Sequence, residues 1–386
     1  MRAVLLILLG YAVSLPDCLL AQTPALQRQA NTYHRPKFEA GPVKVFPEVH
    51  ADRSVTFQIS ASSATNVSIS LPELGRTQPM EKDSQGTWSV TIGPLEPNIY
   101  AYSFLVDGAK VLDSPNPFGR LGGQSAGSLL EIPGNPPRFD EIQQVPHGSL
   151  VLLSYVSTPY KKLRNLYVYL PPGYDTQANR KYPALYLRHG DGQSEASWLF
   201  QGRAGAILEN LLAQGKAVPM IIVTTFGESN ATGGGSPEGI EALYNELRED
   251  VMPLVEQRFR VLSGPEHRAI AGLSMGGGQA FTMGMKHLDQ FAWIGSFSSG
   301  LLGDPDFRLE QYLPGIVADA PGVRRKLRLL FLSCGTEDPR TTGQLEVIAA
   351  LKKYEIQSVW FSPPGGHTFL VWRPTLREFL QRLFEQ

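Results

Sequence analysis

The chain has 386 residues, 42% of them hydrophobic and 18% charged, and its 35 Lys and Arg nearly balance its 36 Asp and Glu. The apolar share is large enough for packed cores, which excludes a wholly disordered chain. A net charge of −1 argues against a partner such as nucleic acid, whose binding depends on neutralised phosphates. Two cysteines are too few for a disulfide-rich scaffold or a four-cysteine zinc site. The length suggests two domains.

Residues 1–21 have the features of a secretory signal peptide. Arg2 precedes an apolar run at 4–9, and Ala21 is a small residue at the expected cleavage point. The run is too short to span a bilayer, which disfavours a membrane anchor. The acidic residue before Cys18 disfavours lipid attachment there. The sequence therefore predicts a secreted or periplasmic protein without a membrane segment after the signal is removed.

The first half of the remaining chain has a strand-like period of two. Residues 22–40 are polar and unpatterned, which is typical of a tether. Short segments that alternate apolar and polar residues follow across 41–135, separated by turn signals, and this pattern predicts an antiparallel β-sandwich. The alternating positions include Val55, Phe57, Ile59, Val67, Ile69, Trp88, Val90, Tyr100, Tyr102 and Phe104.

The second half, 148–386, alternates apolar runs with amphipathic stretches. This order of elements predicts an α/β domain with a mostly parallel sheet. A helical pattern around 243–255 is expected to kink or end near Pro253, and Pro374 is expected to begin the last helix. The runs read as buried strands are Leu166–Leu170, Ala184–Leu187, Met220–Thr225, His267–Gly272, Trp293–Phe297 and Leu327–Leu332.

The pattern Gly-x-Ser-x-Gly occurs twice, around Ser125 and around Ser274. In a nucleophile elbow the serine stands on a sharp turn between a strand and a helix. Ser125 lacks both neighbours and is rejected. Ser274 follows a strand-like run and precedes a plausible helix, so it is the candidate nucleophile; a Gly-rich structural turn or a phosphate loop is the alternative, but no Lys-Ser/Thr pair is nearby.

A serine hydroxyl needs a base that takes its proton. In α/β-hydrolases the histidine comes last in chain order, which leaves His287 and His367. His287 lies on the helix behind the elbow and is expected to face solvent, whereas His367 lies in a loop between a strand and the last helix. Because catalytic groups gather beyond the carboxyl ends of strands, His367 is the predicted base.

The orienting carboxylate is expected between the serine and the histidine. Glu337 and Asp338 directly follow a strong strand, and the shorter Asp338 is preferred because aspartate is the commoner partner of a catalytic imidazole. One oxyanion donor is expected at the backbone N–H of Met275, and the second in the turn at Gly190 and Asp191.

These segments resemble the esterase D superfamily, and most of all carbohydrate esterase family 1 with its feruloyl esterases. The resemblance spans 148–386 and implies an α/β-hydrolase whose nucleophile, acid and base are Ser274, Asp338 and His367. The family often has an uncharged residue where Asp191 stands, which puts the second oxyanion donor in question. The matching segments are 170–174, 201–204, 267–279, 334–338 and 365–372.

The front segment resembles an early-set, immunoglobulin-like domain, with Trp88, 100–104, 107–108 and Asp113 carrying the likeness. Related domains bind starch-like glucans, but aromatic residues at strand period are more typical of a core. Trp198 and Trp372 are candidate walls of the substrate cleft, with core positions as the alternative.

The resemblance implies a secreted serine esterase that cleaves feruloyl or acetyl esters on plant polysaccharides. It implies no metal and no cofactor, and leaves the oligomeric state open. Alternatives within the superfamily are a hydrolase of enterochelin-type trilactones and an acyltransferase. A further alternative is a catalytically silent carbohydrate-binding protein that keeps the hydrolase fold, but the complete serine, histidine and aspartate set argues against it.

Overall fold

The computed structural model describes residues 47–120, 122, 126–228 and 230–385. The predicted signal peptide and tether lie outside the described residues, as does most of the rejected motif around Ser125. The residues described here belong to one compact unit, Lys44–Gln386. None of its described helices is long and apolar enough to cross a membrane.

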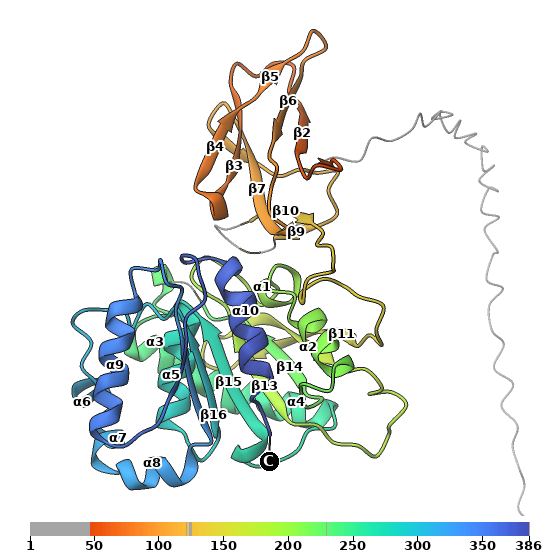
Figure 1. Ribbon diagram of the computed structural model, residues 1–386. Helices are drawn as coiled ribbons and strands as arrows, with labels where there is room; N and C mark the ends of the chain where they lie inside the picture. The colour runs from red at the N-terminus through yellow and green to blue at the C-terminus, as the bar shows by residue number, and fades with distance from the viewer. Residues whose placement is uncertain (1–46, 121, 123–125, 229, 386) are drawn as a thin grey trace, which may run out of the picture. The chain divides into compact units, whose positions relative to one another are not determined.

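The segment from 48 to 132 is all-β, as predicted (Figure 1). One sheet has the order β1-β2-β6-β5, and the other has the order β4-β3-β7-β10-β9 with β8 paired to β7. A short 3₁₀ helix, η1 (Pro72–Leu74), joins β3 to β4. The strands are β1 (Glu48–Val49), β2 (Val55–Ser60), β3 (Val67–Leu71), β4 (Arg76–Pro79), β5 (Glu81–Lys82), β6 (Thr87–Ile92), β7 (Asn98–Val106), β8 (Ala109–Val111), β9 (Gly119–Arg120) and β10 (Gly127–Ile132).

The aromatic residues of this segment are core residues. Trp88, Tyr100, Tyr102 and Phe104 are buried in one hydrophobic cluster between the strands. The indole Nε1 of Trp88 donates to the carbonyl of Ala61 at 3.0 Å, so its polar edge is satisfied inside the protein. Alternation along the strands therefore reflects sandwich packing, and these rings do not form an exposed stacking surface.

The second half is built on one eight-stranded sheet with the order β11-β12-β14-β13-β15-β16-β17-β18. The first two strands form an antiparallel hairpin, and β12 pairs antiparallel with β14. From β14 to β18 every pairing is parallel, which confirms the predicted α/β-hydrolase class. The strands are β11 (Ser149–Ser157), β12 (Lys162–Leu170), β13 (Ala184–Arg188), β14 (Ile221–Thr225), β15 (Arg268–Leu273), β16 (Trp293–Phe297), β17 (Leu329–Ser333) and β18 (Val359–Phe361).

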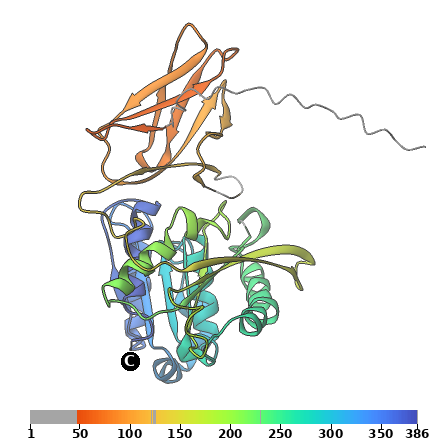
Figure 2. The same ribbon diagram turned by 90° about the vertical axis from the view of Figure 1, so that its right-hand side faces the viewer.

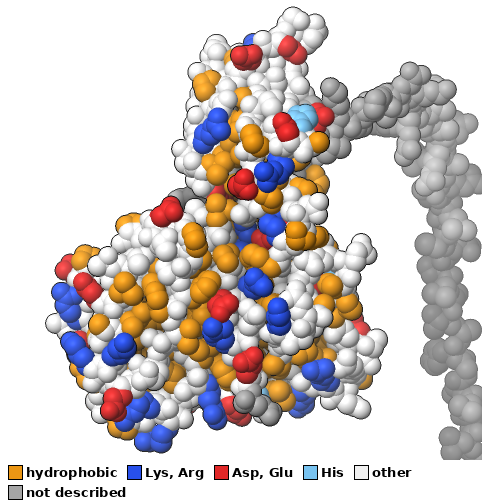
Figure 3. Space-filling model, viewed as in Figure 1, with side chains coloured by type: hydrophobic (Ala, Val, Ile, Leu, Met, Phe, Trp, Pro, Cys, Tyr) orange, Lys and Arg blue, Asp and Glu red, His pale blue; other side chains and the backbone are white. Residues whose placement is uncertain are grey.

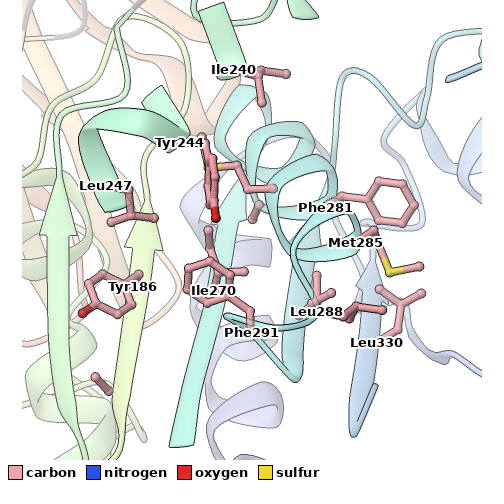
Figure 4. Close-up of a cluster of buried hydrophobic side chains, with 14 of the residues drawn as sticks. Tyr186, Ile240, Tyr244, Leu247, Ile270, Phe281, Met285, Leu288, Phe291 and Leu330 are labelled. Carbon is pink, nitrogen blue, oxygen red and sulfur yellow. The ribbon is translucent and has the colours of Figure 1, made fainter. Parts of the chain in front are cut away.

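Helices cover both faces of this sheet (Figures 1 and 2). The central strands have apolar side chains on both faces, because alternate residues enter different cores. In β15, Ile270 packs into the cluster beneath α3 and α5 (Figure 4), whereas Ala269 and Ala271 pack against α2 and α10. The helices are α1 (Ser197–Phe200), α2 (Ala204–Ala213), α3 (Pro237–Glu246), α4 (Met252–Arg258), α5 (Met275–Lys286), α6 (Leu309–Tyr312), α7 (Pro314–Ala318), α8 (Ala320–Lys326), α9 (Thr341–Lys353) and α10 (Phe369–Leu380), with the π-helical turn η4 (Leu247–Val251) and the 3₁₀ turns η3 (Asn230–Thr232) and η5 (Pro265–His267).

One of the two expectations about prolines needs correction. Pro374 does not begin the last helix, because α10 already begins at Phe369 and contains this proline. The buried side chains of Phe369, Val371 and Trp372 pack the first turns against the sheet, and this packing outweighs the local signal of the proline. Near Pro253 the regular α-helix is interrupted, in line with the expected kink or end: the π-helical turn η4 separates α3 from α4, and Pro253 lies in the first turn of α4.

Charges of both signs are interspersed on the face of the molecule shown in Figure 3, in line with the balanced composition.

Candidate active site

Ser274 stands on a strained turn between β15 and α5. Its φ of 53° and ψ of −119° are unfavourable for a residue with a side chain, as a nucleophile elbow requires. The flanking glycines permit the turn: a Cβ on Gly272 would lie 2.4 Å from the carbonyl oxygen of Gly276, and one on Gly276 would lie 2.3 Å from that of His189. The local sequence therefore forces the serine out at the carboxyl end of β15.

His367 lies beside this serine, in the loop between β18 and α10. Its Nε2 lies 2.9 Å from Ser274 Oγ, and its Nδ1 lies 2.6 Å from Oδ2 of Asp338. The ring is also held from one side by Trp372, in an edge contact with centroids 4.9 Å apart. The structure thus brings the three predicted residues into one hydrogen-bonded chain.

Asp338 is fully buried, in the loop that follows β17. Its second oxygen, Oδ1, accepts from the backbone N–H of Arg340 at 3.1 Å and from the guanidinium at 3.2 Å. Burial acts to raise the pKa of Asp338, but the hydrogen bond with His367 and the contacts with Arg340 outweigh it and lower the pKa to about 2. The neighbouring Glu337 is exposed and takes no part in this chain.

His287, the other histidine considered, lies at the far end of the helix that begins behind the serine. It caps α5 after twelve residues, about 18 Å along the axis from Ser274. Its ring stacks on Tyr244 with centroids 3.5 Å apart, so it is half-buried against α3 instead of facing solvent. Distance excludes it as the base.

The turn after β13 faces the elbow. His189 is buried there, and its ring joins Gly190 and Gly227: Nδ1 lies 2.7 Å from the Gly190 carbonyl, and Nε2 accepts from the Gly227 N–H at 2.8 Å. Because Nε2 is an acceptor, Nδ1 carries the proton and the ring is neutral. Burial lowers the pKa of His189 to about 4, in agreement with this tautomer. No sequence pattern pointed to a role for His189.

The expected oxyanion donors lie at this junction. Met275 is the first residue of α5. Its N–H therefore has no partner within the helix and points out of the N-terminal end of α5. The N–H of Gly190 donates to Oε1 of Gln193 at 3.1 Å. The second oxyanion donor, expected at Gly190 or Asp191, stays a prediction.

A cavity of about 260 Å³ opens at Ser274. Its lining includes four residues that the sequence placed near the site, namely Gly190, Asp191, His367 and Trp372. They meet beyond the carboxyl ends of the parallel strands, where a site was expected. Trp198 was considered a candidate wall of the cleft, with a core position as the alternative, and the structure shows the core position. Its side chain is 1% exposed and does not line this cavity.

The indole of Trp198 has a structural role that the sequence pattern did not reveal. Its Nε1 donates to the carbonyl of Arg188 at 2.9 Å, and its ring meets Phe297 and Phe369 edge to face. The ring thus supports β13 from beneath the site. Among the described residues, no group of three or more His, Cys, Asp or Glu side chains is arranged to hold a metal ion.

The family model described as "Putative esterase" matches residues 157–383. The chain is similar to an endo-1,4-beta-xylanase/feruloyl esterase of Xylanibacter ruminicola, with 31% identity over 353 residues that cover 89% of this chain and 46% of the relative. It is also similar to endo-1,4-beta-xylanase Y of Acetivibrio thermocellus, with 27% identity over 58% of this chain and 21% of the relative. The chain thus spans less than half the length of these relatives.

Two solved structures extend the comparison. A ferulic acid esterase of Anaeromyces mucronatus, in complex with ferulic acid, superposes with a TM-score of 0.54 at 25% identity, covering 64% of this chain and 94% of that one. The enterobactin esterase of Shigella flexneri gives a TM-score of 0.63 over 86% of this chain and 94% of that one, and at 20% identity this likeness concerns the fold alone. Together with the matched family model, the elbow and the α/β-hydrolase sheet identify this chain as a member of the esterase family, with the feruloyl esterases among its relatives.

Proposed function

We propose that this protein is an exported serine esterase that cleaves feruloyl or acetyl esters on plant polysaccharides. The observation that carries the proposal is the hydrogen-bonded chain from Ser274 through His367 to Asp338, with Nε2 of the histidine 2.9 Å from the serine oxygen. The relatives named for feruloyl esterase activity supply the substrate class. Export rests on the predicted signal peptide at 1–21.

In this mechanism Ser274 Oγ attacks the ester carbonyl carbon while Nε2 of His367 takes the hydroxyl proton. Asp338 keeps the imidazole in the required tautomer and stabilises the imidazolium, and its low pKa keeps it ionised throughout. The carbonyl oxygen becomes an oxyanion, which the backbone N–H of Met275 and the turn at Gly190 and Asp191 would stabilise.

Collapse of this intermediate breaks the bond to the sugar oxygen, which leaves as an alcohol with the proton from His367. The acyl group remains on Ser274. Water then attacks the acyl-enzyme with His367 again as base, and the carboxylic acid is released. The cycle uses only these side chains and water, and it regenerates the starting enzyme.

The test has two stages. A fluorophosphonate probe should label the folded wild-type protein and should fail to label Ser274→Ala; absence of labelling in the wild type would favour a silent binding protein. A panel of methyl ferulate, acetylated xylan and a catecholate trilactone then identifies the acyl group. Turnover of the trilactone alone would overturn the polysaccharide proposal while leaving the esterase intact.

A further inference from the structure

The cavity at Ser274 has walls from both halves of the molecule. Its lining includes Ser274 and Trp372 from the hydrolase, and also Pro72, Glu73 and Arg120 from the β-sandwich. Glu73 belongs to η1, and Arg120 ends β9. The sandwich therefore contributes charged side chains to the space in which a substrate would lie.

The carboxylate of Glu73 is fixed at this boundary by two hydrogen bonds. Its Oε2 accepts from the backbone N–H of Ala101 at 3.0 Å, and its Oε1 accepts from Nε2 of Gln201 at 2.8 Å. Each carboxylate oxygen can accept more than one hydrogen bond, so Glu73 keeps acceptor capacity toward the cavity. Burial raises the pKa of Glu73, and the positive charge of Arg120 opposes this rise.

Arg120 presents the opposite hydrogen-bonding capacity. Its Nε is buried and has no hydrogen-bond partner among the described residues. Burial lowers the pKa of Arg120, and the charge of Glu73 acts in the other direction. Because Arg120 lines the cavity and its guanidinium is incompletely paired, a hydrogen-bond acceptor on a bound ligand would compensate part of this cost through the groups that face the cavity.

A buried arginine of the hydrolase keeps this wall in place. Arg373, 1% exposed, donates from Nη1 to the carbonyl of Gln201 and from Nη2 to that of Ile99 in β7, both at 3.1 Å. Its Nε lies 2.8 Å from Asp140, in the segment that connects the two halves. Because Arg373 directly follows Trp372 of the cavity, the sandwich is fastened to the element that lines the site.

We propose that the β-sandwich forms part of the acyl-binding site, and that Arg120 and Glu73 are specificity-determining residues for an aromatic acyl group that carries a phenolic hydroxyl. A guanidinium only donates hydrogen bonds and a carboxylate only accepts them, whereas a phenolic hydroxyl does both. An acyl group without the hydroxyl would leave both partly buried groups incompletely paired. This inference rests on the proposed function and assigns the recognition to residues outside the hydrolase domain.

The test compares kcat/KM for methyl ferulate and methyl cinnamate, which lacks the ring substituents. Wild type should prefer the ferulate by about tenfold or more, and Arg120→Met and Glu73→Gln should each reduce that preference about tenfold. Arg76→Met, at an exposed position on β4, is the matched control and should keep the wild-type preference. Arg120→Lys retains the charge and should restore part of the preference.

Each outcome decides between the two proposals. If wild type cleaves methyl ferulate and both variants keep its preference, the role of the sandwich is overturned and the proposed function stands. If wild type hydrolyses p-nitrophenyl acetate but neither aromatic ester, the feruloyl proposal falls and this inference falls with it. If a variant loses all turnover, the test becomes a binding measurement. Calorimetry then compares the affinities of Ser274→Ala for the two intact methyl esters with those of the same protein that also carries Arg120→Met. An equal loss of affinity for both esters contradicts the inference.

Discussion

The Nδ1 atom of His367 lies 2.6 Å from Oδ2 of Asp338, 29 residues earlier in the chain. The two residues stand in different loops, one after β17 and one after β18, and these neighbouring parallel strands bring them together. The carboxylate is fully buried, whereas the imidazole is 25% exposed at its side chain and remains accessible from the cavity. The buried carboxylate therefore holds Nδ1 of the imidazole, and Nε2 is left to exchange a proton with Ser274.

Asp338→Asn should lower kcat by about 10⁴, because an amide in this place favours the wrong imidazole tautomer. The measurement is steady-state hydrolysis of the best ester of the panel. Glu337→Gln is the matched control, since this neighbouring carboxylate is exposed, and it should retain nearly full activity. If the control loses activity and Asp338→Asn does not, the acid has been assigned to the wrong residue.

The sequence was sufficient to select the three residues that the structure joins by hydrogen bonds, because each of them carries a local signal. Ser274 stands in a strand-Gly-x-Ser-x-Gly-helix context, and Asp338 and His367 each follow a strand. Chain order left His287 and His367, and the loop position of His367 beyond the end of a strand decided between them. The alternation of apolar runs and helical patterns predicted the sheet, although β11 was missed, since its hairpin with β12 leaves large hydrophobic side chains such as Leu152 and Val156 exposed.

The remaining features depend on contacts between residues far apart in the chain. Glu73 and Gln201 are separated by 128 positions, and Arg373 reaches β7 across 274. No periodicity or spacing links such pairs, so the sandwich wall of the cavity was not predictable. Trp198 illustrates a second limit of the sequence. An aromatic residue gives the same sequence pattern whether it lines a cleft or packs in a core, and only the structure shows that Trp198 is a core residue.

Gly276→Ala should destabilise the elbow and abolish most activity. The added Cβ would lie 2.3 Å from the carbonyl oxygen of His189, and neither backbone can move without shifting the turn that faces Ser274. Thermal unfolding should shift by several degrees, as expected for a loss of about 1–3 kcal/mol from overpacking. Gly315→Ala, in α7 with nothing within 4 Å of the new Cβ, is the control and should leave stability unchanged or raised. A stable, active Gly276→Ala would contradict the steric account of the elbow.

Because His189 is buried in its neutral form, the free energy of unfolding should fall when the pH is lowered. Its folded pKa of about 4 lies below the ordinary value of 6.5, so the native state resists protonation and the unfolded state does not. The stabilising contribution is therefore complete above pH 6.5 and is lost as the pH falls toward 4, by up to ~3 kcal/mol. Urea unfolding at a series of pH values measures this, with His189→Gln as comparison. If the pH dependence between 6.5 and 4 is the same in the variant, another group causes it.

Arg373→Met should weaken the junction between the sandwich and the hydrolase. Removing the guanidinium leaves the carboxylate of Asp140, 2% exposed, without one of its charged partners, and leaves the carbonyls of Ile99 and Gln201 without a donor. Breaking a buried pair from one side costs about 3–5 kcal/mol, although the second partner of Asp140, Arg138, should soften the loss.

Equilibrium unfolding of Arg373→Met and of Arg382→Met tests this difference. Arg382, just beyond the end of α10, pairs with Glu378 at 2.7 Å; both side chains are partly exposed, and solvent-accessible pairs of this kind contribute about 0–1 kcal/mol. Because Arg373 follows Trp372 in the cavity wall, its variant should also raise KM for an aromatic ester more than it lowers turnover of p-nitrophenyl acetate. Equal stability of the two variants would show that the sandwich is held to the hydrolase by its apolar contacts, and that the buried arginine contributes little beyond specificity.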